Sequence, residues 1–184
     1  MIIVLFGAPG VGKGTQADIL AQKLGIAHLS TGDAFRSAIS NRTPVGLQAK
    51  EYVDSGKLVP DEIVAKIVEE AMATSDFSKG CILDGFPRTR TQADALSALL
   101  DHVGRDIERV VNITVDDSTI VTRLLQRGRT DDVEDVIQHR LDVYNQETAP
   151  LLDYYAARGK LVSIDGLGTV EEVNQRILDA LRGT

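Results

Sequence analysis

The sequence is poor in cysteine, in aromatic residues and in long apolar runs. It holds one cysteine, Cys81, and no tryptophan, and aromatic residues make up 4% of its 184 positions. One cysteine can form neither an internal disulfide nor a cysteine-rich zinc site, which favours a reducing compartment. The apolar run at residues 2–6 is too short for a signal or membrane helix and has no basic stretch ahead of it. We therefore expect a soluble cytoplasmic protein without structural zinc and without a membrane partner.

Positive charge is also scarce. The chain has 20 Lys and Arg against 27 Asp and Glu, a formal net charge of −7. General binders of nucleic acid or of membrane surfaces carry a basic excess, so the balance argues against both partners. The length and the 43% hydrophobic content suit one globular core, and no linker or internal repeat is visible. We expect a single domain over residues 1–184.

What the chain does contain is an alternation of strand-like and helical stretches. Short apolar runs predict strands at 2–6, 81–84, 110–115 and 160–165, and amphipathic patterns predict helices at 13–24, 92–100, 119–126 and 169–181. Thr169 and Glu172 have the spacing of a capping box at the start of the last helix. Alternating strands and helices predict an α/β fold with a parallel sheet covered by helices on both sides.

Two segments interrupt this alternation. Residues 30–59 lack a convincing strand and indicate short helices near 33–39 and 45–55, punctuated by Pro44 and Gly56. We expect this segment to form a small helical insertion. The second is the charged loop RGRTDD, at residues 127–132, ahead of a long helix.

A glycine-rich stretch follows the first predicted strand. Residues 7–13, GAPGVGK, have the spacing G-x-x-x-x-G-K between a strand and a helix, which is the context of a phosphate-binding P-loop. Backbone N–H groups and the helix N-terminus would bind an anion there, and Lys13 adds a full charge. Gly14 stands where Ser or Thr is usual, and Thr15 comes next. A glycine turn without ligand is the structural alternative, and the motif alone covers many functions.

Four stretches in the same order narrow the class. They are GKGT at 12–15, LSTGDAFR at 29–36, LDGFPRTRTQ at 83–92, and RGRTDD with the downstream Arg140. Over almost its whole length the chain resembles the adenylate kinases, nucleoside monophosphate kinases, in their short-lid form. The resemblance implies a P-loop kinase fold with a five-stranded parallel sheet, a nucleoside monophosphate (NMP)-binding insertion at 30–59 and a short lid at 126–132. It also implies a monomer that transfers a phosphoryl group reversibly from Mg-ATP to AMP, giving two ADP, for adenine nucleotide homeostasis and salvage.

The resemblance assigns residues to two nucleotide sites. For ATP it implies Gly10, Val11, Gly12, Lys13, Gly14, Thr15, Arg123, Arg127 and Gly168. For AMP it implies Thr31, Arg36, Lys57, Leu58, Val59, Gly85, Phe86, Pro87, Arg88, Gln92, Arg129 and Arg140, with Arg88 on the phosphate and Gln92 on the adenine edge. The residues expected to take part in catalysis are Lys13, Arg88, Arg123, Arg129 and Arg140.

The arginines fit the chemistry independently of the resemblance. Phosphoryl transfer between nucleotides crowds negative charges, and the arginine fork binds phosphate oxygens in pairs. Arg123, Arg127 and Arg129 lie within seven positions of an acidic chain. A solvated helix face with ion pairs is the alternative, but like charges at Arg123 and Arg127, four apart, would destabilise an isolated helix.

Asp84 ends a predicted strand, where parallel strands face the ligand crevice. We expect it to hold Mg²⁺ through water, since Mg²⁺ keeps most of its hydration shell. The alternative is a helix-capping aspartate. Asp33 is a weaker candidate, and the histidines His28, His102 and His139 are expected to be structural or exposed.

Alternatives remain for the acceptor and for the activity. Thr31 and Gln92 match the adenine-specific pattern, whereas UMP/CMP kinases carry Ala and Asn at these positions. A nucleotide sensor without catalysis would bind ATP and signal through a partner. A plain ATPase would need no second nucleotide site, which would leave the insertion and Gln92 unexplained.

Overall fold

The computed structural model describes residues 1–74 and 77–183. Five parallel strands form one sheet in the order β2-β3-β1-β4-β5. They are β1 (Ile2–Phe6), β2 (Ala27–Ser30), β3 (Cys81–Asp84), β4 (Arg109–Thr114) and β5 (Leu161–Asp165). All of β1 is buried, as expected for a central strand that is apolar on both faces.

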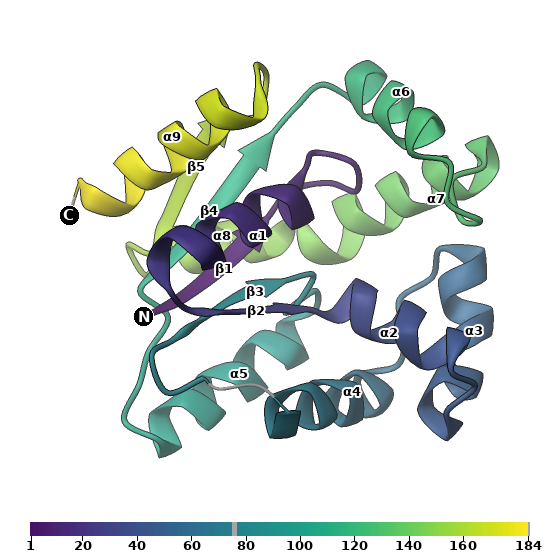
Figure 1. The fold of residues 1–184 in the computed structure, drawn as a ribbon, viewed down its shortest axis with the longest axis horizontal. Coiled ribbons are helices and arrows are strands. Elements are labelled where there is room, and N and C mark those ends of the chain that lie inside the picture. The colour runs from purple at the N-terminus through teal and green to yellow at the C-terminus, as the bar shows by residue number, and fades with distance from the viewer. Residues whose placement is uncertain (75–76, 184) are drawn as a thin grey trace.

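Helices cover both faces of the sheet (Figure 1). On one face Ile3 and Leu5 pack with residues of α1 (Lys13–Leu24), α6 (Asp117–Arg127), α7 (Glu134–Val143) and α9 (Val170–Arg182). On the other face Ile2, Val4 and Phe6 belong to one core cluster with residues of α2 (Thr31–Ser40), α4 (Asp61–Thr74), α5 (Arg90–His102) and α8 (Pro150–Ala156). Helix α3 (Pro44–Ser55) joins this cluster by packing against α2 and α4. The predicted three-layer α/β fold with a parallel sheet is confirmed.

Most predicted elements form within one or two residues of their expected ends. Gly25 ends α1 in the left-handed conformation, with φ of 64°. The capping box at α9 is present, because the Thr169 hydroxyl accepts from the Glu172 N–H while the Glu172 carboxylate accepts from the Thr169 N–H. The predicted helices of the 30–59 segment form as α2 and α3, with Thr43 as the side-chain cap of α3.

Some elements were not predicted. Strand β2 lies at the sheet edge, and of its four residues only Leu29 is buried, so no apolar run marks it. Helix α4 begins after Pro60 with Asp61 and Glu62 in its first turn. These residues are a helix start signal, but the prediction rested on the alternation of strands and helices and did not include this helix. The long helix after the charged loop consists of α7, a π-helical turn, η1 (Tyr144–Thr148), and α8.

The two interrupting segments approach each other (Figure 1). Gly56, at the end of α3, lies so close to α7 that a Cβ there would be 2.8 Å from the Cγ of Arg140. Helix α6 extends through Arg127, so the loop between α6 and α7 comprises residues 128–133; we call it the α6–α7 loop. Among the described residues, the helices are too short or too polar to cross a membrane.

Candidate active site

The P-loop connects β1 to α1 at the carboxyl edge of the sheet. Gly7 has φ of 138°, and a Cβ there would lie 2.5 Å from the carbonyl oxygen of Ile113, so only glycine fits. Gly12, in the left-handed region, precedes α1 without a side-chain cap. The first N–H groups of α1 therefore have no side-chain acceptor at this end, which suits them to bind an anion.

Lys13 points back along this loop. Its ammonium donates to the carbonyl oxygens of Gly7, at 2.7 Å, and Ala8, at 3.0 Å. The pKa of Lys13 is lowered to about 8, first of all by burial and then by the positive charges of Arg88 and Arg140, while Asp84 opposes this shift. A phosphate placed here would favour the charged form further and raise this pKa.

Asp84 lies at the end of β3, beside the start of α1. Its side chain is buried, and a Cβ built on Gly14 would lie 3.6 Å from its Oδ2. The capping alternative is not what the structure shows, because the side chain of Thr89 caps α5 by accepting from the Gln92 N–H at 3.2 Å. Asp84 is thus free of that role and stands next to the P-loop helix.

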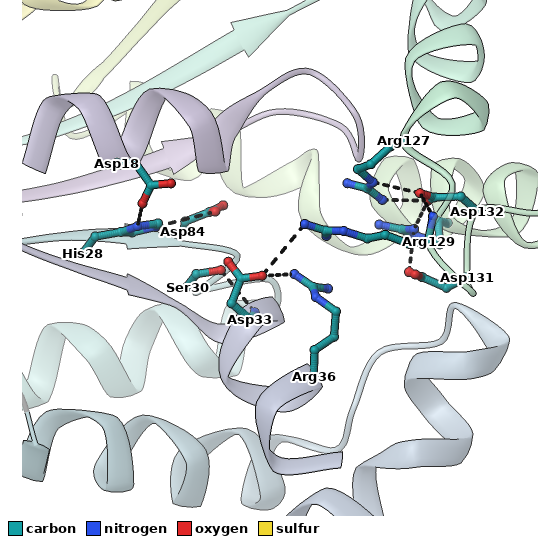
Figure 2. A network of polar contacts seen from close by, with 11 residues as sticks. Asp18, His28, Ser30, Asp33, Arg36, Asp84, Arg127, Arg129, Asp131 and Asp132 are labelled. Carbon is teal, nitrogen blue, oxygen red and sulfur yellow. Dashed lines mark hydrogen bonds and ion pairs between the residues drawn. The ribbon is translucent and has the colours of Figure 1, made fainter. Parts of the chain in front are cut away.

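His28, on β2, is the near neighbour of Asp84 (Figure 2). Its Nε2 lies 3.8 Å from the Asp84 carboxylate, and its Nδ1 lies 2.8 Å from that of Asp18. Burial acts to lower the pKa of His28, but the two carboxylates outweigh it and raise this pKa. No local motif indicates this contact, because it depends on how β2 pairs with β3.

A cleft opens between the P-loop, α2, α3 and the turn after β3. Of the predicted site residues, those that line it are Lys13, Thr31, Arg36, Lys57, Leu58, Val59, Gly85, Pro87, Arg88, Gln92 and Arg140. Apolar and aromatic residues without a predicted role also line it, namely Phe35, Val53, Val64, Val143 and Tyr144. The lining of the cleft thus combines cationic groups with apolar and aromatic side chains against which a base could lie.

The turn after β3 is compact. The Thr31 hydroxyl donates to the carbonyl oxygen of Gly85 at 2.9 Å, and Arg88 Nε donates to the same oxygen at 2.8 Å. Gly85 has φ of 79°, and a Cβ there would lie 2.8 Å from the Thr31 hydroxyl. The Phe86–Pro87 peptide bond is cis. Although solvent reaches Arg88 from the cleft, burial lowers its pKa, Arg140 and Arg36 lower it further, and Asp84 opposes them.

The arginines near the α6–α7 loop are held by carboxylates (Figure 2). Arg127 makes a paired contact with Asp132, through Nε at 2.8 Å and a terminal nitrogen at 2.6 Å. Arg140 donates to Asp131 at 2.8 Å and to Asp132 at 3.3 Å. Both carboxylates are buried. Asp131 and Asp132 belong to the RGRTDD motif but had no predicted role; two adjacent acids beside an arginine cluster were the available signal.

A further ion pair crosses between the two interrupting segments. Arg129, in the α6–α7 loop, lies 3.9 Å from the carboxylate of Asp33 on α2, which also binds Arg36 (Figure 2). The backbone N–H of Arg129 donates to Asp132 at 3.1 Å. Asp33 thereby joins two arginines that were assigned to phosphate binding.

Arg123 points elsewhere. Its guanidinium donates to the carbonyl oxygens of Val11, in the P-loop, and Gly166, after β5, both at 3.3 Å. It is therefore not one of a row of solvated charges on α6. Other predicted residues lie outside the lining of the cleft, in the P-loop, at the end of β3, around the α6–α7 loop or after β5; they are Gly10, Val11, Gly12, Gly14, Thr15, Asp84, Phe86, Arg123, Arg127, Arg129 and Gly168.

The donors for a metal are few. Within the described part of the chain, no group of three or more His, Cys, Asp or Glu side chains is arranged to hold a metal ion. One buried carboxylate beside a phosphate-binding loop instead fits an ion such as Mg²⁺, which takes few protein ligands and shares substrate phosphates.

Comparison with known proteins agrees with this geometry. The family model described as adenylate kinase matches residues 5–160. The chain is 52% identical over 181 residues to an adenylate kinase of Corynebacterium glutamicum strain R, covering 98% of this chain and 99% of that protein. It is 51% identical over 175 residues to adenylate kinase 1 of Nostoc sp. PCC 7120, covering 95% of each.

A longer relative shows that the family varies in length. The adenylate kinase of Geobacter sp. strain M21 is 46% identical over an alignment of 213 residues, which covers 99% of this chain and all of that protein. Since this alignment is longer than the present 184 residues, that relative contains segments absent here. With its parallel sheet, its P-loop and these matches over almost its full length, the chain belongs to the adenylate kinase family.

Proposed function

We propose that this protein is an adenylate kinase, a nucleoside monophosphate kinase that transfers the terminal phosphoryl group of ATP to AMP and forms two ADP, reversibly. One observation carries the proposal: Lys13 of the P-loop lines the same cleft as Arg36, Arg88 and Arg140. A nucleotide-binding loop and a second cluster of phosphate-binding groups thus face each other, which a plain ATPase would not need.

On the donor side we assign ATP phosphates to the P-loop. The N–H groups of residues 10–15 and the Lys13 ammonium would bind the β- and γ-phosphates. Arg123, which is fixed to both the P-loop and the turn after β5, would stand between the phosphates and the adenosine. Gly168 lies in that turn, and its backbone would meet the adenine. Arg127 would contact ATP from the end of α6.

On the acceptor side we assign AMP to the cleft. Arg36 and Arg88 would hold its phosphate, Thr31 and Gln92 would meet the adenine, and residues 57–59 would contact adenine and ribose through backbone. Gly85, Phe86 and Pro87 shape the turn that positions Arg88. The apolar surface from Phe35 and Val64 would cover a face of the base.

The residues carry the chemistry mainly by position and charge. An AMP phosphate oxygen attacks the γ-phosphorus of ATP, and the bond from that phosphorus to the β–γ bridging oxygen breaks. The attacking oxygen is already anionic, so little general-base work is needed. Arg88, Arg129 and Arg140, with Lys13 and Arg123, stabilise the charge that spreads over the transferred group. One such arginine is worth on the order of 10³ in rate in comparable enzymes.

Magnesium fits this site through Asp84. Mg²⁺ bound with ATP would neutralise charge on the β- and γ-phosphates, and Asp84 would hold its water ligands from the end of β3. The carboxylate is buried beside Gly14, which sets it next to the P-loop. Its burial and single charge suit contact through water better than a cage of protein ligands.

The two interrupting segments would close the site. We infer that the insertion at 30–59 binds the acceptor as an NMP-binding unit and that the short lid at 126–132 covers ATP. The Arg129–Asp33 ion pair between them, and the close approach of Gly56 to Arg140 of α7, support a joint movement that excludes water from the reacting phosphates. The protein would act as a monomer in the cytoplasm, in adenine nucleotide homeostasis and salvage; its one thiol, Cys81, is buried and suits a reducing compartment.

Product analysis by nucleotide chromatography tests the function. The protein is incubated with Mg-ATP and one of AMP, CMP, UMP or GMP, and once without acceptor. ADP formed in quantity only with AMP is the expected result. Transfer mainly to CMP or UMP would keep the mechanism but change the acceptor. Turnover without acceptor would show an ATPase, and tight ATP binding without turnover would show a sensor.

A further inference from the structure

The side-chain amide of Gln92 is fixed on both of its ends. Its Oε1 accepts a hydrogen bond from the backbone N–H of Arg88 at 2.7 Å, and its Nε2 donates to Oδ1 of Asp61 at 2.7 Å. The side chain is 5% exposed and lines the cleft. The residue that would read the base is thus oriented by its neighbours.

Only one orientation of this amide is compatible with these partners. A backbone N–H can only donate, and an ionised carboxylate can only accept. If the amide turned over, its NH₂ group would face the Arg88 N–H and its oxygen would face the Asp61 carboxylate, so both hydrogen bonds would be lost. The positions of oxygen and nitrogen therefore follow from the partners themselves.

Asp61 is itself held in place. It comes from the first turn of α4, whereas Gln92 lies on α5. The hydroxyl of Thr89 donates to the Asp61 carboxylate, at 3.3 Å from Oδ2, and accepts from the Gln92 N–H as the cap of α5. Among the described residues, Gln92 lines the cleft and Asp61 does not, so Asp61 stands behind Gln92 as seen from the cleft.

The fixed amide keeps one N–H and one oxygen lone pair free, in a set order. A 6-aminopurine offers an acceptor at N1 and a donor at the 6-position, whereas a 6-oxopurine offers a donor at N1 and an acceptor at the 6-position. For a base held in one pose, the two purines therefore require opposite orientations of the amide. An amide free to turn over would bind either of them.

We propose that Asp61 is a specificity-determining positioning residue, which locks the Gln92 amide in the orientation that accepts a 6-aminopurine and rejects a 6-oxopurine. The inference rests on the proposed function, because it concerns the base that Gln92 meets in the acceptor site. It adds a residue from a different helix, outside the cleft, to the groups that decide which nucleotide is phosphorylated.

The test compares AMP with inosine monophosphate, IMP, which differs from AMP at the 6-position. We measure kcat and KM for both acceptors, and the KM for ATP, in wild type, Asp61→Ala and Asp61→Asn. Glu62→Ala is the matched control, since it removes an exposed carboxylate from the same helical turn. Circular dichroism monitors the folding of each variant. If Asp61→Ala does not fold, Asp61→Leu replaces it, because leucine fills the space without offering a hydrogen-bond acceptor.

We expect Asp61→Ala to lower the ratio of kcat/KM for AMP to that for IMP by about tenfold, mainly through a higher KM for AMP, with the KM for ATP unchanged. Tenfold corresponds to about 1.4 kcal/mol, the scale of one hydrogen bond to a charged group. Asp61→Asn, which keeps an acceptor oxygen, should retain the ratio within about threefold, and Glu62→Ala should match wild type.

An unchanged ratio in Asp61→Ala or Asp61→Leu, with both acceptors weakened equally, would overturn the proposal and leave Asp61 a structural role. The proposal would also be overturned if Glu62→Ala lowered the ratio of kcat/KM for AMP to that for IMP as much as Asp61→Ala does. The effect would then come from losing a negative charge at the start of α4, and not from the contact with Gln92. Failure of the proposed function looks different: wild type itself would then not phosphorylate AMP.

Discussion

Arg88 places a charge in the cleft while contributing few contacts to the core. Its guanidinium donates to the carbonyl of Gly85 within its own turn, and solvent reaches it from the cleft. We expect Arg88→Ala to lower kcat by roughly 10³-fold, the scale of one charge-stabilising arginine, and to change the free energy of unfolding by less than about 1 kcal/mol. Steady-state kinetics and urea unfolding measure the two quantities.

Arg90→Ala is the matched control for this substitution. Arg90 is exposed on α5, where it pairs with Asp94 and stacks on Tyr154, away from the cleft lining. Its loss should leave kcat near wild type. Near-normal turnover in Arg88→Ala would remove Arg88 from the site, and a large loss of stability would mean that the turn after β3 depends on it.

We expect Lys13 to take up a proton when the phosphates of ATP bind. The pKa of Lys13 is lowered, mainly by burial, from the ordinary 10.5 to about 8 in the folded protein. Below pH 8 the buried charge therefore reduces the free energy of unfolding. This loss of stability becomes smaller as pH rises from 8 to 10.5, where the folded state has released the proton and the unfolded state still holds it. A bound triphosphate favours the charged form and raises the pKa. Titration calorimetry of ATP at pH 8, in buffers of different ionisation enthalpy, should show uptake of about half a proton.

Lys13→Met should abolish that uptake and weaken ATP binding. Equal proton uptake by wild type and by the variant would assign the titration to another group. The effect cannot be read from the motif, because the GK pair is the same whether or not the loop buries its lysine. What lowers the pKa is the surrounding protein, together with Arg88 and Arg140 from distant parts of the chain.

At the scale of elements, the α6–α7 loop is organised around one carboxylate. Asp132 accepts from the Arg127 guanidinium, from the backbone N–H of Arg129 and from Arg140. We expect Asp132→Asn to lower the free energy of unfolding by about 2 kcal/mol, less than for a fully buried pair, because Arg127 is partly exposed. It should also raise the KM for ATP, since Arg127 would lose its orientation.

The pH dependence of this loss follows from the Asp132 pKa. Burial acts to raise it, but the hydrogen bonds from Arg127 and from the Arg129 N–H outweigh burial and lower it below the ordinary 3.8. The stabilisation is therefore present above pH 3.8 and lost as pH falls through the lower folded-state value. Urea unfolding at pH 7 and in acid measures the difference, with Asp135→Asn, exposed in the first turn of α7, as control. A difference from wild type that stays constant into acid would refute the assignment.

The elements that could be predicted are those with their own local signal. Strand β1 is a buried apolar run, α9 carries a capping box, and α3 lies between Pro44 and Gly56. Each of these signals lies within or next to the element itself, so each element can be predicted from its own stretch of sequence. Strand β2 was missed because it becomes a strand by pairing with β3, not through an apolar pattern of its own. Such an edge strand is decided by tertiary context.

At the scale of the whole molecule, the site also contains residues that local motifs predict and residues that only tertiary packing brings there. The motifs name the groups expected to meet nucleotides, such as Lys13 and Arg88, and the cleft brings both together. They do not name the carboxylates that orient those groups. Asp61 reaches Gln92 only because the fold brings the first turn of α4 to the first turn of α5, and His28 reaches Asp84 only because β2 pairs with β3. Partners that are distant in sequence depend on packing, which local patterns do not contain.

The last prediction concerns closure of the whole molecule. The insertion meets the α6–α7 loop through the Arg129–Asp33 ion pair and approaches Arg140 of α7 at Gly56, whereas the sheet carries the P-loop and is buried between helices. A bisubstrate inhibitor that joins both nucleosides through phosphates would bind arginines on both segments. Amide hydrogen exchange should therefore slow in α2, α3 and residues 128–133, and stay unchanged in α9, which serves as the internal control.

An ATP analogue alone should protect the P-loop and residues 128–133 but leave α2 and α3 exchanging as in the free protein, because Arg36 of α2 would bind the acceptor phosphate and not the donor. Protection of α2 and α3 by the donor alone would mean that the segments move as one body, through the Asp33 contact. Absence of protection in both segments with the bisubstrate inhibitor would contradict closure. In that case the cleft would have to exclude water without moving, and the arginines would bind phosphates in the positions that they occupy now.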